Sequence, residues 1–308
     1  MSYNVTLFGI KFVLKPIAFT LPIGKGWDIY WYGIIIALGF LMAVIYATKN
    51  AKLFNLNADK MLDVALVTTP LAILCARIYY VIFDGKKLNG VGDFFGFSDG
   101  QGFSGLAIYG GVIGAFLVGG IMCKVFHLKI TDMFDIAAIG FLIGQGIGRW
   151  GNFVNQEAYG TFTGSSFWGM QSERTVAELG EGLVHPCFLY ESIWCLIGAF
   201  LLHRLAKKRH FSGEIILSYG VWYGMGRAVI ELLRTDSLML GGIKVSCLLS
   251  VLLALICLVA IIVIRKRISE NSGSDDYVAV FAQPVNDDLS QENKQDDNET
   301  ENTPLETE

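Results

Sequence analysis

The stretch that decides the fold is AAIGFLIGQGIGRWGNFVNQEAYG, residues 137–160. Its first eleven residues are apolar or small apart from one glutamine, which is typical of a helix that crosses a membrane. The next thirteen, residues 148–160, bring an arginine, two asparagines and a glutamate to the end of that helix. An ionised side chain costs about 2.5–3.5 kcal/mol at the centre of a membrane helix. Such a cluster therefore predicts a functional site at the helix end.

The composition of the whole chain indicates a membrane protein. Hydrophobic residues make up 53% and charged residues 17% of the 308 residues, whereas about 25% are charged in an ordinary soluble domain. About 20 apolar residues in a helix cross a bilayer, and a helix satisfies its own backbone hydrogen bonds there. We therefore predict an all-α, polytopic membrane protein. Its seven transmembrane helices are expected near residues 31–48, 61–83, 105–123, 133–150, 186–203, 214–233 and 244–264.

The distribution of Lys and Arg between the loops predicts the orientation. Segments 49–60, 124–132, 204–214 and 265–267 hold twelve Lys or Arg in 35 residues, against six in the 95 residues of the loops on the other side. Because basic loops stay in the cytoplasm, the C-terminus is expected there and the N-terminus outside. VTLFGIKFVL, residues 5–14, is expected to lie along the outer interface and not to be a cleavable signal peptide.

The charge divides the chain into two predicted parts. Residues 269–308 hold twelve Asp or Glu and one Lys, so residues 1–268 carry a net charge of +7 although the whole chain carries −4. We expect residues 1–268 to form the membrane domain. Residues 269–308, acidic and poor in apolar residues, are expected to be a disordered cytoplasmic tail.

With this orientation, ionisable residues from several helices fall in the outer half of the membrane. Three of them, Arg227, Glu231 and Arg234, are spaced to share one helical face. The others are Arg77, Arg149, His185 and Glu191, with Tyr32 and Tyr109 at the outer starts of two helices. Arginines outnumber carboxylates, and guanidinium binds phosphate oxygens in bidentate fashion, so the set predicts a site for a phospholipid headgroup. The alternative is that these residues snorkel and pair for structural reasons.

Other sequence features point to packing. The glycine-rich stretches 108–120 and 139–151 predict close helix contacts, and Gly160 predicts a turn or a close backbone approach. The six cysteines and four histidines lack the spacing of metal ligands, so we expect no metal site.

The quoted segment GRWGNFVNQEAYG resembles the signature of the bacterial prolipoprotein diacylglyceryl transferases, G-R-x-G-N-F-x-N-x-E-x-x-G. Its fixed positions are met by Gly148, Arg149, Gly151, Asn152, Phe153, Asn155, Glu157 and Gly160. Four further stretches agree in order: WYG at 31–33, ARIYYVIF at 76–83, HPCFLYE at 185–191 and GRAVIELLR at 226–234. The resemblance covers roughly residues 27–265 and leaves the acidic tail outside.

The resemblance implies a reaction. Members of the family transfer the diacylglyceryl group of phosphatidylglycerol to the lipobox cysteine thiol of prolipoproteins, forming a thioether and releasing glycerol phosphate. This first step of lipoprotein maturation takes place at the outer face of the bacterial cell membrane. The expected partners are phosphatidylglycerol, prolipoprotein signal peptides with a lipobox cysteine, and membrane lipids. Neither a cofactor nor nucleic acid is expected.

The resemblance also implies roles for individual residues. The two critical arginines of the family map onto Arg149 and Arg227, which we expect to stabilise charge on the leaving phosphate. The remaining expected contacts with substrate come from Tyr32, Asn152, Glu157, Gly160 and Glu231. Many family members carry a histidine in a His-Gly-Gly triplet where this chain has Tyr109. We predict Tyr109 to be catalytic, although tyrosine titrates near ~10 and is a weaker candidate base than histidine near ~6.5. Either Tyr109 acts only as a hydrogen-bond partner, or the field of the arginines lowers the relevant pKa.

A function of another class remains as an alternative. A polytopic transporter or channel with an anion site in the outer leaflet would also need the arginines. A transporter is expected to show internal repeats and a site near the membrane midplane. The signature is not repeated in the chain, and the charges lie away from the midplane.

Overall fold

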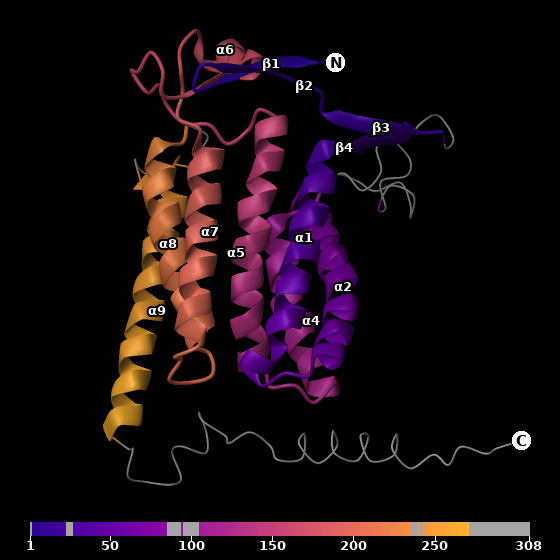
Figure 1. The fold of residues 1–308 in the computed structure, drawn as a ribbon, viewed down its shortest axis with the longest axis vertical. Helices are drawn as coiled ribbons and strands as arrows, with labels where there is room; N and C mark the ends of the chain where they lie inside the picture. Colours follow the sequence, from indigo (N-terminus) through magenta and orange to yellow (C-terminus); the bar gives the residue numbers. More distant parts are fainter. Residues whose placement is uncertain are drawn as a thin grey trace, which may run out of the picture.

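Seven long helices stand side by side and make up most of the protein, which we describe from a computed structural model (Figure 1). The structure describes residues 2–22, 27–84, 94, 105–235, 239–240 and 243–270. Within these residues the long helices are α1 Trp31–Asn50, α2 Ala58–Asp84, α4 Ile108–Val125, α5 Ile130–Val154, α7 Cys187–Ala206, α8 Glu214–Leu233 and α9 Val245–Glu270. They correspond to the seven predicted segments, with ends that differ by a few residues. The predicted boundary after residue 268 falls inside α9, and residues 271–308 of the acidic tail lie outside the described residues.

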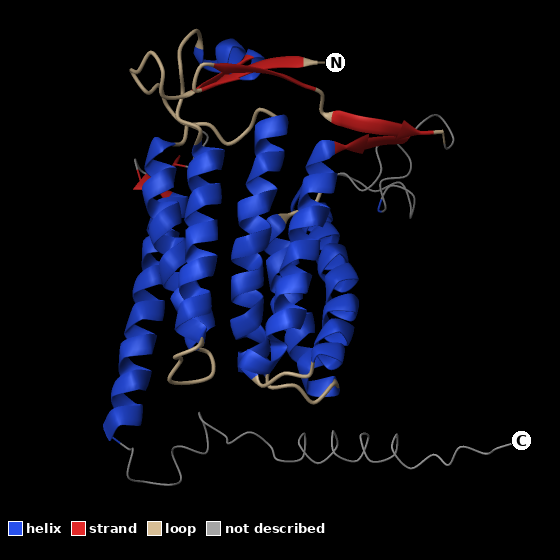
Figure 2. Cartoon of the chain, viewed as in Figure 1, coloured by secondary structure: helices blue, strands red, loops and turns tan. Residues whose placement is uncertain are grey.

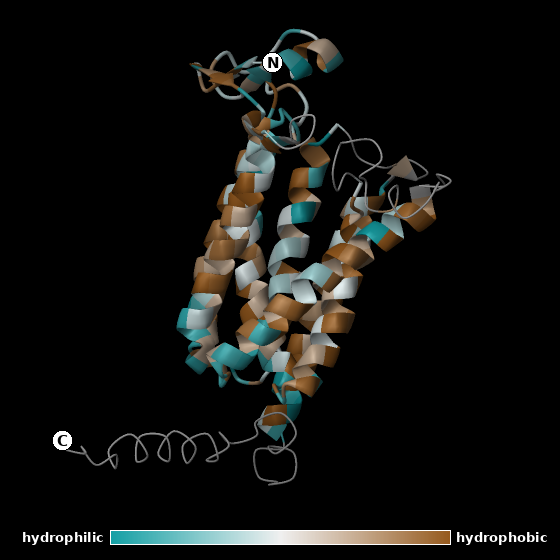
Figure 3. Cartoon of the chain, turned by 90° about the vertical axis from the view of Figure 1, so that its right-hand side faces the viewer, coloured by the Kyte–Doolittle hydropathy of each residue, from teal (hydrophilic) through white to brown (hydrophobic). Residues whose placement is uncertain are grey.

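Six of these helices are long and apolar enough to cross a membrane, and α8 is not among them. α8 has 20 residues, but it carries Glu214, Arg227 and Glu231. Figure 3 shows hydrophobic residues along the flanks of the helices and hydrophilic ones gathered toward the helix ends. Leu66 and Val229 are among many large apolar side chains that are exposed. An apolar surface of this extent is typical of a protein surrounded by lipid, so the membrane prediction is confirmed for six helices.

The all-α prediction is wrong at one end of the bundle, where strands form a cap (Figure 2). β1 (Tyr3–Leu7) pairs with β2 (Ile10–Leu14) and with β5 (Met170–Ser172). The short helix α6 (Glu173–Leu179) follows β5. A second hairpin, β3 (Ile17–Leu21) and β4 (Trp27–Tyr30), leads into α1. Two smaller elements complete the described structure, the β6–β7 ladder (Met239–Leu240 and Ile243–Lys244) and the 3₁₀ turn η1 (Ala51–Phe54).

The first hairpin has a local cause that the prediction overlooked. Phe8 and Gly9 both have positive φ, as the two central residues of a tight hairpin turn require. Val5 and Leu7 are buried under this sheet, and residues two apart lie on the same face of a strand. The segment predicted to lie along the interface therefore folds as an alternating β-hairpin.

Small residues let the helices approach closely, as predicted. A Cβ on Gly110 of α4 would lie 2.7 Å from the carbonyl oxygen of Cys75 in α2. Between α1 and α5, a Cβ on Gly39 would lie 3.0 Å from the carbonyl oxygen of Gly144. Such contacts bring backbones together without a hydrophobic driving force between helices in lipid.

A closed ionic network holds the end of the bundle opposite the cap. Asp135 of α5 is fully buried and accepts hydrogen bonds from the backbone N–H groups of Gly213 and Ile216, at 2.8 and 2.9 Å. Its carboxylate also pairs with Arg209 at 3.0 Å, and Arg209 pairs with Asp132 at 2.8 Å. Asp135 thus satisfies the start of α8, where unpaired N–H groups favour a negative charge.

Candidate functional site

Three arginines share one buried carboxylate at the cap end of the bundle. Glu191, in the second turn of α7, is only 5% exposed. It forms an ion pair with Arg149 of α5 and accepts a hydrogen bond of 3.0 Å from Arg227 of α8. Arg234, just after α8, lies 3.5 Å from the same oxygen of Glu191. We call Glu191 and these three arginines the arginine cluster.

α8 supplies a second carboxylate to this cluster. Glu231 lies one turn after Arg227 and binds it at 2.7 Å, while its own side chain is buried. Residues four apart on a helix lie on one face, which places the pair side by side. Just beyond, Lys244 Nζ donates hydrogen bonds to the carbonyl oxygens of Glu231 and Arg234, both at 2.7 Å. This cation satisfies the C-terminal carbonyls of α8 and holds the helix end in place.

The end of α5 carries the polar part of the signature. Arg149 donates to Asn152 Oδ1 at 3.4 Å, and Asn152 donates in turn to Glu157 Oε2 at 3.4 Å. Gln156 and Ala158, on either side of Glu157, both have φ of +56°. Left-handed backbone is uncommon in residues other than glycine and often marks a functional turn. The turn therefore directs Glu157 back toward Asn152.

The cap supports this turn from outside. Gln156 is buried, and its side-chain oxygen accepts a hydrogen bond of 3.1 Å from the backbone N–H of Arg174, in α6. The Arg174 side chain lies 3.6 Å from Glu157 and hydrogen-bonds Glu178 at 2.9 Å. The hydrogen bond to Glu178 raises the pKa of Arg174, which stays charged. A chain of polar contacts thus connects α6 with Arg149.

Gly160 joins the loop after α5 to the cluster, as the predicted close approach requires. Its N–H donates to the carbonyl oxygen of His185 at 2.8 Å, and it forms a β-bridge with Arg234. A Cβ at this position would lie 2.7 Å from the carbonyl oxygen of Leu233. Any larger residue would push the loop away from the ends of α7 and α8.

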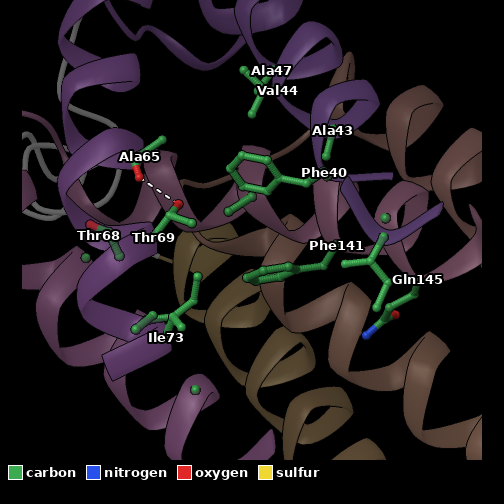
Figure 4. Close-up of a pocket in the computed structure, with 18 of the residues that line it drawn as sticks. Phe40, Ala43, Val44, Ala47, Ala65, Thr68, Thr69, Ile73, Phe141 and Gln145 are labelled. Carbon is green, nitrogen blue, oxygen red and sulfur yellow. Dashed lines mark hydrogen bonds between the residues drawn. The ribbon is translucent and has the colours of Figure 1, made fainter. Parts of the chain in front are cut away.

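A cavity of about 620 Å³ opens beside Arg149, between α1, α2, α4 and α5. Tyr32, Arg149 and Asn152 line its cap end. The rest of its wall is almost entirely apolar, and Figure 4 shows Phe40, Ile73 and Phe141 directed into it. Ligand sites commonly have this form, an apolar hollow of about 300–1,000 Å³ with few polar groups.

The structure separates three residues from this arrangement. Arg77 donates to the carbonyl oxygens of Phe94 and Gly105 at 2.6 and 2.9 Å, and so supports the segment before α4. His185 Nδ1 lies 3.2 Å from the Tyr190 hydroxyl. Tyr109 is 68% exposed at the start of α4, and no hydrogen bond or ring contact of its side chain occurs within the described residues.

Sequence analysis named all residues of the arginine cluster as ionisable groups at one level, but it gave Glu191 no role in the site. Glu191 was noted as a charge at the outer level, yet it was not among the expected substrate contacts. The number of arginines could have identified it, because several arginines buried at one depth need a carboxylate to pair with. Within the described residues, no group of three or more His, Cys, Asp or Glu side chains could hold a metal ion.

Comparisons with known proteins place the chain in one family. Residues 16–263 match the model of a family described as prolipoprotein diacylglyceryl transferase. A relative from Limosilactobacillus reuteri, named phosphatidylglycerol--prolipoprotein diacylglyceryl transferase, is 41% identical over 266 residues, which are 84% of this chain and 94% of the relative. A protein of the same name from Pediococcus pentosaceus is 42% identical over 82% of this chain and 91% of its own length. One from Clostridium perfringens, with the same name followed by the numeral 1, is 42% identical over 82% and 96%.

Proposed function

The chain belongs to the prolipoprotein diacylglyceryl transferase family, and from this premise we propose how its residues carry out the transfer. It is a transferase that moves the diacylglyceryl group of phosphatidylglycerol to a prolipoprotein. The names of the relatives favour this function over a transporter or channel. The acceptor atom in this proposal is the thiol sulfur of the lipobox cysteine in the signal peptide.

The reaction exchanges one bond for another at a glycerol carbon. The cysteine sulfur forms a bond to the carbon of the diacylglyceryl group as the bond from that carbon to the phosphate oxygen breaks. The electron pair leaves with that oxygen, which produces glycerol phosphate, and the thiol proton leaves with a base or with the phosphate. Negative charge therefore grows on the phosphate in the transition state.

The observation that carries the proposal is the sharing of Glu191 by three arginines beside an apolar cavity. The arginine cluster and Glu231 together have one more positive than negative charge. Because Glu191 already fixes the guanidinium groups, they need little reorganisation when a phosphate arrives. Arg149 and Arg227 are the two groups that we assign to the phosphate. Asn152 is assigned to the glycerol hydroxyls or phosphate oxygens.

The apolar cavity suits the acyl chains of the same lipid. Acyl chains gain little by moving from a bilayer to an apolar wall, since both environments exclude water. Recognition of the donor lipid therefore depends on its headgroup. Tyr32, Arg149 and Asn152 line the cavity at the end where that headgroup would lie.

The thiol needs activation, since a free cysteine has a pKa of about 8.5. We assign this activation to the positive charge of the arginine cluster, which favours a thiolate. Tyr109 remains the catalytic residue predicted from the sequence. Tyr109 does not line the apolar cavity, so its role is the one that most needs a direct test.

The proposal includes a membrane topology. We assign α8 as a seventh membrane span, with the cap and arginine cluster on the extracytoplasmic side of the bacterial cell membrane. The charges of α8 are paired, Glu214 with Arg265 and Arg227 with Glu191 and Glu231. Pairing lowers the cost of placing such residues within a membrane.

A reconstituted reaction tests the function directly. The full chain would be purified and mixed with phosphatidylglycerol and a peptide containing a lipobox cysteine. Mass spectrometry is expected to find the diacylglyceryl mass on the cysteine, and an alkylated peptide serves as the control. No adduct, under conditions in which the Limosilactobacillus reuteri relative forms one, would contradict the proposal.

A further inference from the structure

A second hollow lies beside Asn155, at the end of α5, and is distinct from the lipid cavity. It has a volume of about 530 Å³ and lies where β4 runs into α1. One wall consists of Asp28, Ile29 and Tyr30, which are consecutive residues of β4. The other wall includes Gly33 and Ala37 of α1.

The strand wall of this hollow belongs to a strand with a single neighbour among the described residues. β4 belongs to a two-stranded sheet and pairs only with β3 among the residues that the structure describes. Within the described part of the chain, one edge of β4 thus has no strand beside it, and alternate N–H and C=O groups of a strand point outward from such an edge. An extended peptide can add to an open edge as a further strand, with backbone hydrogen bonds that do not depend on its sequence.

Gly33 indicates that a ligand comes close to the helix wall. It lies in the first turn of α1, and a Cβ built at this position meets no atom within 4 Å. It has a negative φ, so neither packing nor backbone conformation demands glycine here. Glycine weakens a helix relative to alanine. Its presence facing a hollow is explained if another backbone approaches that position.

The hollow leads to the reaction site. Tyr32 lines both the hollow and the lipid cavity. Asn155 lines the hollow and lies one helical turn after Asn152, which lines the lipid cavity. A ligand in the hollow therefore meets the lipid site at Tyr32.

We propose that this hollow binds the prolipoprotein, whose extended segment around the reacting cysteine adds to the open edge of β4 and packs over Gly33. The inference rests on the proposed transferase function. The reaction has two substrates, and the sulfur must approach the glycerol carbon from the side away from the leaving phosphate. Separate hollows that meet at Tyr32 let lipid and peptide reach one carbon from different directions. The small residues Gly33 and Ala37 leave room for the peptide backbone to come close to α1.

The test compares two glycines that both face open space. Gly120 of α4, like Gly33, has no atom within 4 Å of a Cβ built on it, but it lies outside both hollows. Initial rates would be measured with the full chain in lipid nanodiscs, varying the peptide and phosphatidylglycerol separately. Gly33→Leu is expected to raise the KM for the peptide about tenfold or more and to leave the KM for phosphatidylglycerol within about twofold. Gly120→Leu is expected to change neither.

The outcomes distinguish a failure of the proposed function from a failure of the proposed peptide site. If the wild-type chain forms no adduct, the proposed function fails. If the wild type is active and Gly33→Leu leaves the peptide KM unchanged, or raises both KM values equally, the peptide site is wrong. Gly33→Ala provides a milder variant, which should keep or raise the thermal unfolding midpoint while still raising the peptide KM.

Photo-cross-linking gives an answer that does not depend on variant folding. A lipobox peptide with a photoreactive residue beside the cysteine would be irradiated with the wild-type chain, and the linked residues mapped by mass spectrometry. Cross-links to residues 28–37 are expected, and an excess of the unlabelled peptide should remove them. Cross-links confined to other helices would overturn the proposal.

Discussion

The two ends of the helix bundle both bury carboxylates among arginines, but with opposite balances of charge. At the end away from the cap, Asp132 and Asp135 surround the single cation Arg209, and backbone N–H groups complete the contacts. At the cap end, three arginines share Glu191, and Glu231 pairs with one of them. The arginines there retain 13–24% side-chain exposure, whereas the Asp135 side chain has none.

This difference separates a structural network from a binding site. A buried ion pair is stable when every lone pair and proton has a partner, and Asp135 meets that condition. The arginine cluster is held in place by Glu191, and its guanidinium groups stay partly accessible. Positive charge that is fixed and partly accessible can bind an anion with little reorganisation.

Removal of Asp135 should have the largest effect and should act on stability. In Asp135→Ala, Arg209 keeps Asp132, but Gly213 and Ile216 lose their acceptor in a buried site. Breaking a buried pair in this way costs about 3–5 kcal/mol. Chemical unfolding in detergent would measure the loss, with exposed Asp63→Ala as the control, expected within about 0.5 kcal/mol. Equal stability of the two variants would show that the network contributes little.

Replacement of Arg149 should have the next largest effect and should act on catalysis. Lysine keeps the charge in Arg149→Lys but lacks the planar fork that binds two oxygens. A loss of about 10²–10³ in kcat/KM is expected, or about 2.7–4 kcal/mol. Arg209→Lys, at the opposite end, should lower stability and leave kcat/KM of the folded protein unchanged. Near-normal turnover of Arg149→Lys would argue against a bidentate phosphate contact.

Neutralising Glu191 probes how the cluster is held. Glu191→Gln keeps the size of the side chain but weakens its hold on three guanidinium groups. We expect kcat to fall about tenfold, or about 1.4 kcal/mol, without an increase in the KM for phosphatidylglycerol, since the positive charge of the cluster increases. Glu178→Gln in the cap is the control and should stay within about twofold. A higher KM with an unchanged kcat would mean that Glu191 contacts the lipid itself.

The smallest effect is expected at Tyr109. Its side chain is 68% exposed and lines neither hollow, so Tyr109→Phe should keep kcat/KM within about twofold. Tyr109→His should also remain active, because the family resemblance implies a histidine at this position in many members. A tenfold loss in Tyr109→Phe at unchanged stability would instead support the catalytic role predicted from the sequence.

Most of the bundle could be predicted from the sequence, because length and apolarity are local properties. The hairpin of residues 3–14 was missed, since its alternation is short and its turn depends on positive φ at Phe8 and Gly9. α8 was predicted as a membrane helix, although its charges keep it below the apolarity of the other six. The seven-span count and the orientation stay predictions.

Some features of the site also follow from local sequence, whereas others depend on tertiary packing. The sequence by itself determined the signature, the excess of arginine at one depth and the spacing of Arg227 and Glu231, because a helix fixes which neighbours share a face. Only the tertiary structure decided that Glu191 joins Arg149 and Arg227, that Arg77 supports another segment, and that Arg174 of α6 reaches Glu157. These partners lie 17 to 42 residues apart along the chain. Their pairing depends on how helices pack and loops fold back, which no local pattern of residues specifies.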